Sequence, residues 1–142
     1  MTGNADGRVT NLVLVDDDAV DVMNVRRALQ RVHSSIRLHV AGDGIEALAL
    51  LRGGTVPVDR RLLLLDINMP RMNGLELLRE LRADPDLQST PVVVLTTSGD
   101  EQDRREAYRL NVAGYMIKPV TAVAFFELMA ALDRYWSLVE LP

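Results

Sequence analysis

The chain has 142 residues, 48% of them hydrophobic, which is enough for one well-buried core but too few for two full domains. It contains no cysteine, so nothing favours a disulfide-stapled secreted protein or a thiolate metal site. The net charge of −4 gives no electrostatic case for nucleic-acid binding. Residues 1–10 lack the apolar core of a signal peptide, and no apolar run approaches the length of a membrane span. We therefore expect a cytoplasmic domain that binds neither nucleic acid nor membrane.

Short apolar runs alternate with helical patterns along the chain. Runs rich in Val, Leu and Ile predict strands at residues 12–15, 62–65, 92–95 and 113–117, and an alternating pattern predicts another at 36–40. Helical spacing and stop signals predict helices over 19–32, from Asp43-Gly44 to Gly53-Gly54, over 75–83, over 101–110 and from near Thr121. Five strand–helix repeats with short connections predict a parallel α/β sheet covered by helices on both faces. We expect one domain over residues 11–137, between a polar N-terminal tail (1–10) and a C-terminal tail (138–142).

Four of the predicted strands end abruptly at polar residues. The groups that follow them are Asp16-Asp17-Asp18, Asp66, Thr96-Thr97-Ser98 and Lys118-Pro119. Because ligands of an open parallel sheet bind beyond the carboxyl ends of its strands, we expect these side chains to converge at one edge. Lys118 is the only lysine among 16 basic residues, which favours a requirement for a compact ammonium over a planar guanidinium at that place.

In this order, the motifs resemble those of the receiver domain of two-component response regulators. The resemblance covers about residues 11–131 and rests on the acidic cluster, Leu65-Asp66-Ile67-Asn68-Met69-Pro70, Asn73-Gly74, Thr96 and Lys118-Pro119. It implies a flavodoxin-like (βα)5 doubly wound fold with strand order 2-1-3-4-5. It also implies a cis peptide bond between Lys118 and Pro119.

Asp66 is the candidate phosphoacceptor, because a carboxylate can attack phosphorus and form an aspartyl phosphate. Together with Asp16, Asp17 and Lys118 it carries a local charge of −2, and two like charges ~4 Å apart repel by ~4 kcal/mol at a dielectric of 20. A divalent cation would remove this repulsion, and oxygen ligands point to Mg²⁺, with Mn²⁺ as a substitute. By resemblance, Asp17, Asp66 and the carbonyl of Asn68 bind the ion directly, and Asp16 acts mainly through water.

The polar residues at the remaining strand ends are expected to bind a phosphoryl group and to respond to its presence. Lys118 and Thr96 are expected to contact phosphoryl oxygens, with the adjacent Thr97 as the alternative to Thr96. Asp18 is expected to cap the first helix rather than to bind the ion. Tyr115 is either a core-edge aromatic or, by resemblance, a rotamer switch that changes the surface of the fourth helix, fifth strand and final helix.

The sequence thus predicts a phosphoprotein of a two-component phosphorelay. We expect no further domain after the final helix, and therefore a stand-alone regulator that accepts a phosphoryl group from a histidine kinase and turns over no outside substrate. The chain also resembles the small regulators paired with bacterial phytochromes, in Asp16-Asp17-Asp18, Asp21, Leu95-Thr96-Thr97-Ser98 and the tail Leu138-Val139-Glu140-Leu141-Pro142. Two alternatives are a Mg²⁺-dependent phosphatase with an aspartate nucleophile, for which the chain leaves little room for a lid, and a phosphorylation-independent pseudo-receiver.

The final helix predicts a homodimer. Its apolar residues sweep an arc of roughly 180°, wider than the ~100° needed to cover one sheet face, and surplus apolar surface usually marks an interface. The candidate interface residues are Phe126, Tyr135, Leu138 and Val139. In the alternative, the helix end and the tail fold back on their own domain.

Overall fold

A computed structural model describes residues 9–141, so most of the predicted N-terminal tail (1–8) and Pro142 lie outside the described residues. Five parallel strands form one sheet in the order β2-β1-β3-β4-β5. They are β1 (Asn11–Val15), β2 (Arg37–Ala41), β3 (Arg61–Leu65), β4 (Val92–Thr96) and β5 (Gly114–Ile117). The predicted flavodoxin-like topology is confirmed.

Five helices alternate with the strands, as predicted. They are α1 (Ala19–Arg31), α2 (Gly44–Arg52), α3 (Gly74–Ala83), α4 (Glu101–Arg109) and α5 (Ala122–Leu138). Each begins after a polar residue whose side-chain oxygen accepts a hydrogen bond from a backbone amide of the first turn, which satisfies an otherwise unpaired donor. Asp18 caps α1 in this way, so its predicted role is confirmed.

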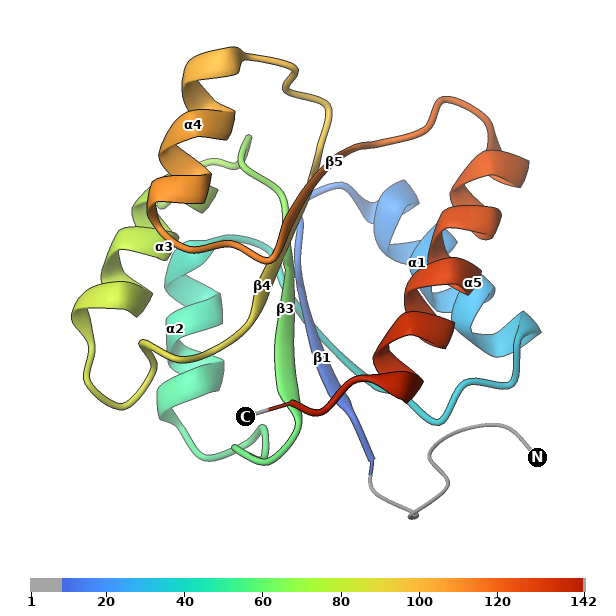
Figure 1. Ribbon diagram of the computed structural model, residues 1–142, viewed down its shortest axis with the longest axis horizontal. Coiled ribbons are helices and arrows are strands. Elements are labelled where there is room, and N and C mark those ends of the chain that lie inside the picture. The colour runs from blue at the N-terminus through green and yellow to red at the C-terminus, as the bar shows by residue number, and fades with distance from the viewer. Residues whose placement is uncertain (1–8, 142) are drawn as a thin grey trace.

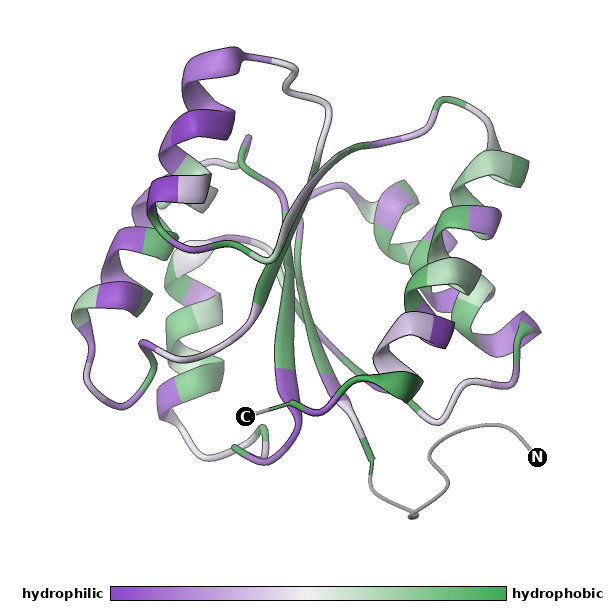
Figure 2. Ribbon diagram, viewed as in Figure 1, coloured by the Kyte–Doolittle hydropathy of each residue, from purple (hydrophilic) through white to green (hydrophobic). Residues whose placement is uncertain are grey.

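The helices cover both faces of the sheet (Figure 1), and Figure 2 shows the strands between them as mostly hydrophobic. Alternate residues of the central strands point to opposite faces. Val13 and Leu63 face the core formed with α2, α3 and α4, whereas Leu12 and Leu62 face the core formed with α1 and α5. Burial on both faces explains why these strands are continuous apolar runs. Over residues 9–141, none of the helices combines the length and apolarity needed to cross a membrane.

The end of α5 and the tail fold back on their own domain. Val139 and Leu141 pack against the core on the α1 and α5 face. Phe126, one of the candidate interface residues, also packs there, with the Arg31 guanidinium 4.6 Å from its ring centroid. The buried Arg60 donates to the carbonyl of Trp136 at 3.3 Å and thereby ties the last turn of α5 to the start of β3.

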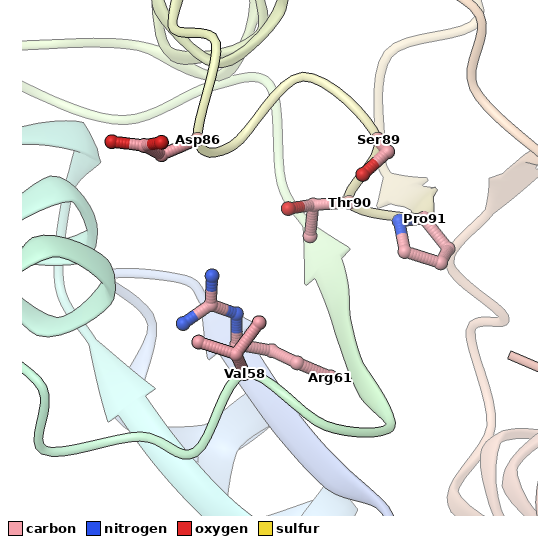
Figure 3. A pocket seen from close by; sticks show the side chains of 6 residues that line it. All are labelled: Val58, Arg61, Asp86, Ser89, Thr90 and Pro91. Carbon is pink, nitrogen blue, oxygen red and sulfur yellow. The ribbon is translucent and has the colours of Figure 1, made fainter. Parts of the chain in front are cut away.

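A small cavity of about 60 Å³ lies at the amino end of β3, away from the predicted site (Figure 3). The buried Arg61 contributes to its lining and donates from Nη1 to the carbonyls of Leu51 and Val56 at 3.4 and 3.3 Å. Because Leu51 lies in the last turn of α2, this cation stabilises the carbonyl end of that helix. Arg61 therefore has a structural role at this end of the sheet.

Candidate functional site

The sheet register brings the predicted site residues together. Val15 pairs with Leu65, and the amide of Asp66 donates to the carbonyl of Val15 at 2.9 Å, so Asp16 and Asp66 follow neighbouring strand ends. On the other side of β3, the amide of Lys118 donates to the carbonyl of Thr96 at 2.8 Å. The carboxyl ends of β1, β3, β4 and β5 thus form one edge, as the sequence predicted.

Three carboxylates at this edge could hold a cation. Asp16, Asp17 and Asp66 each offer an oxygen, and these oxygens lie within 4.8 Å of one another. Asp16 and Asp66 are buried and Asp17 is exposed, so the cluster is open to solvent on one side. Amides position the two buried carboxylates: Asp18 donates to Asp16 Oδ1 at 2.9 Å, and Asn68 donates to Asp66 Oδ1 at 3.1 Å. This all-oxygen set suits a hard divalent cation.

The pKa of Asp16 shows that a negative charge is unfavourable in this cluster. Burial raises the pKa of Asp16 from 3.8 to about 6, although the Asp18 amide and the Lys118 ammonium both lower it. The charge of Asp66 adds to the increase. The ionised Asp16 is therefore in an unfavourable environment that a bound cation would relieve.

Lys118 lies at the centre of the acidic residues, and 7% of its side chain is exposed. Its Nζ is 2.6 Å from Asp21 Oδ2, 2.9 Å from Asp16 Oδ2 and 3.0 Å from Asp66 Oδ2. Burial lowers the pKa of Lys118, but the hydrogen bonds to these three carboxylates outweigh it and the net direction is upward. Lys118 is therefore a buried ammonium with an anionic partner for each of its three protons.

No role in the site was predicted for Asp21. It lies in the first turn of α1, three residues after the cap Asp18, and its side chain is 19% exposed. The position of Asp21 could have indicated this role, because the first turn of a helix that begins at the acidic strand end lies beside the site.

Thr96 and Thr97, which the sequence could not separate, have opposite environments. Thr96 is fully buried, and Thr97 is exposed. The hydroxyl of Thr96 accepts a hydrogen bond from the amide of Ser98 at 3.2 Å. The half-buried Tyr115 donates its hydroxyl to the carbonyl of Ser98 at 2.8 Å. Both predicted switch residues thus contact Ser98, in the loop between β4 and α4.

The peptide bond between Lys118 and Pro119 is trans, so the expected cis bond is wrong. An X–Pro bond favours trans by about 0.5–1 kcal/mol, and only the resemblance pointed to cis.

The Asn73-Gly74 pair shapes the loop that follows Asp66. Asn73 caps α3, and the amide of Gly74 donates to the carbonyl of Ile67 at 3.0 Å. A Cβ on Gly74 would lie 2.4 Å from the carbonyl oxygen of Asp66 and 2.8 Å from Cα of Ile67. Only glycine allows this close approach of two backbone segments, which holds the loop beside the candidate phosphoacceptor.

The doubly wound sheet and its edge of three aspartates, a buried threonine and one lysine are the features of a class of signalling domains, the receivers of two-component systems. Residues 12–131 match the family described as response regulator receiver domain, and the chain belongs to this family. It is 35% identical over 135 residues to response regulator Rcp1 of Synechocystis, a match that covers 92% of both chains.

Two solved structures have the same fold over nearly their full length. The Mn²⁺-bound form of Rcp1 is 34% identical, with a TM-score of 0.84 over 94% of this chain and 99% of that one. The phosphorylated cyanobacterial phytochrome response regulator RcpA is 33% identical, with a TM-score of 0.87 over 95% of this chain and 99% of that one.

Proposed function

We propose that this protein is a single-domain response regulator in which Asp66 accepts a phosphoryl group from a histidine kinase. One observation carries the proposal: Lys118 Nζ lies 3.0 Å from Asp66 Oδ2, within an acidic cluster whose oxygens lie within 4.8 Å of one another. A nucleophilic carboxylate, a cation for a phosphoryl oxygen and ligands for a divalent metal are the parts that phosphoryl transfer requires.

The proposed reaction is a displacement at phosphorus. An oxygen of Asp66 attacks the phosphorus of a phosphohistidine, the P–N bond breaks, and the imidazole leaves with the electron pair. Lys118 and Thr96 bind oxygens of the transferred group. Asp16, Asp17, Asp66 and the Asn68 carbonyl would hold Mg²⁺, or Mn²⁺ in its place, and the ion supplies positive charge for the phosphoryl oxygens. Hydrolysis of the acyl phosphate resets the domain.

We expect Ser98 to couple phosphorylation of Asp66 to the conformational change of the domain. Thr96 accepts from the Ser98 amide and Tyr115 donates to the Ser98 carbonyl, so a Thr96 hydroxyl that turns to a phosphoryl oxygen loses a contact in this loop. Tyr115 would then change its rotamer, and with it the surface of α4, β5 and α5.

The proposed kinase is a bacterial phytochrome. The support is the similarity to Rcp1 and to RcpA, a cyanobacterial phytochrome response regulator. A phosphotransfer profile with purified histidine kinases tests this: the proposal predicts fastest transfer from a phytochrome kinase, with Asp66→Asn as the control that takes no label. Faster transfer from a kinase of another class would contradict the partner, and label on Asp66→Asn would contradict the acceptor.

We also propose that the protein forms a homodimer through α5. Tyr135 and Leu138 are 60% and 78% exposed, whereas Phe126 and Val139 pack against their own core. Near the start of α5, Val120 and Val123 are also exposed. The proposed interface therefore centres on the exposed Tyr135 and Leu138, and Phe126 and Val139 are partly buried against their own core.

A further inference from the structure

Asp21 makes the shortest contact of the Lys118 ammonium. The distance from Nζ to Asp21 Oδ2 is 2.6 Å, against 2.9 and 3.0 Å to Asp16 and Asp66. Asp16 and Asp66 also belong to the group of carboxylates that could hold a metal ion, and Asp21 does not. Asp21 is thus the one carboxylate partner of Lys118, among the described residues, that has no second role in the cluster.

We infer that Asp21 is a positioning residue for phosphoryl transfer, one that keeps the Lys118 ammonium beside Asp66; this inference rests on the proposed function. When Asp16 and Asp66 also serve as metal ligands, the ion would compete with the ammonium for their oxygens. Asp21 retains its contact and holds Nζ in place. Without it, the flexible four-carbon stem lets the ammonium leave the position that a phosphoryl oxygen needs.

The backbone of Asp21 is held in the first turn of α1. Its amide donates to the capping oxygen of Asp18 at 3.3 Å, so the first turn of α1 is fixed at the strand end. At the other end of the contact, the amide of Lys118 is bonded to the carbonyl of Thr96. The pair therefore joins α1 to the end of β5 across the site. A carboxylate on a helix constrains an ammonium more closely than one on a mobile loop.

The variants Asp21→Asn and Asp21→Glu test the inference, with Asp18→Asn as the matched control. Asp18→Asn removes the same charge three residues away and keeps a good cap, because asparagine caps as well as aspartate. Asp66 phosphorylation by phosphoramidate is followed at saturating Mg²⁺. Asp21→Asn should slow it by about tenfold, the effect of one hydrogen bond to a charged group, Asp21→Glu should recover part of the rate, and Asp18→Asn should stay within about twofold of wild type.

A second readout needs no phosphoryl transfer. Lys118 is the only lysine, so protein labelled with ¹⁵N at lysine Nζ has one side-chain ammonium NMR signal. With Mg²⁺ bound, the signal should persist in wild type and Asp18→Asn and be lost to fast proton exchange in Asp21→Asn. An Asp21→Asn rate equal to or above that of wild type, or an unchanged ammonium signal, would overturn the inference. If wild type takes no label on Asp66, the proposed function fails, and the ammonium signal alone still decides whether Asp21 holds Lys118.

Discussion

Replacing Asp16 by asparagine should stabilise the protein when no divalent cation is bound. Asp16 is 4% exposed and has a pKa of about 6 in the folded state. Below pH 3.8 it is protonated in both the folded and unfolded states and has no effect. Between pH 3.8 and about 6 the folded state keeps a proton that the unfolded state has lost, so stability falls as the pH rises. Above about pH 6 the full penalty is present.

The size of the effect follows from the pKa. A rise from 3.8 to about 6 corresponds to about 3 kcal/mol at 1.36 kcal/mol per pH unit. The Asp16→Asn side chain can still accept the amide of Asp18 but places an amide against the Lys118 ammonium, so we expect a net gain of about 1–2 kcal/mol at pH 7.5. For a chain of this size the melting temperature should rise by about 3–8 °C.

Thermal unfolding in EDTA, measured from pH 4 to pH 8, tests this reasoning. The stability difference between Asp16→Asn and wild type should be small near pH 4 and grow until about pH 6.5. Saturating Mg²⁺ should reduce or reverse the difference, because the cation stabilises wild type by binding to the carboxylates of the folded state. A variant that is less stable than wild type at pH 7.5 in EDTA would refute the electrostatic argument.

Three further changes probe other parts of the site and surface. Gly74→Ala should lower the free energy of unfolding by about 1–3 kcal/mol, because its Cβ meets backbone atoms of the Asp66 loop; an unchanged melting temperature would contradict this. Lys118→Arg should retain the fold but slow phosphorylation of Asp66 at least tenfold, since a planar guanidinium cannot occupy the place of the ammonium, and wild-type rates would show that the lone lysine is incidental. Leu138→Arg should convert the proposed dimer to a monomer in light scattering without lowering the melting temperature, because Leu138 is 78% exposed; a wild-type protein that is already monomeric at tens of micromolar would end the dimer proposal.

The sequence predicted the sheet and the position of the site because both depend on local patterns. The leucine and valine runs of β1, β3 and β4 are buried on both faces, and their polar ends share one edge for topological reasons. The N-cap of α1 could also be predicted, because Asp18 directly precedes a helical pattern. These features need no knowledge of how helices pack.

The features that the sequence did not predict depend on tertiary contacts. Asp21 reaches Lys118 only because α1 is oriented toward the end of β5, which no spacing within α1 reveals. The dimer prediction compared the apolar arc of α5 with a single sheet face. In the structure, Phe126 also packs beside Arg31 of α1, and the tail returns Val139 to the core. The apolar excess of α5 is therefore smaller than its helical arc suggested.

Mapping the acyl phosphate tests the proposed function most directly. The protein is treated with phosphoramidate and Mg²⁺, reduced with borohydride to convert the aspartyl phosphate to homoserine, and digested for mass spectrometry. We predict a single modified residue, Asp66, and no modification in EDTA or in Asp66→Asn. Modification of Asp16, as an aspartate-nucleophile phosphatase would show, or equal labelling of Asp66 in EDTA would contradict the proposed role of this site.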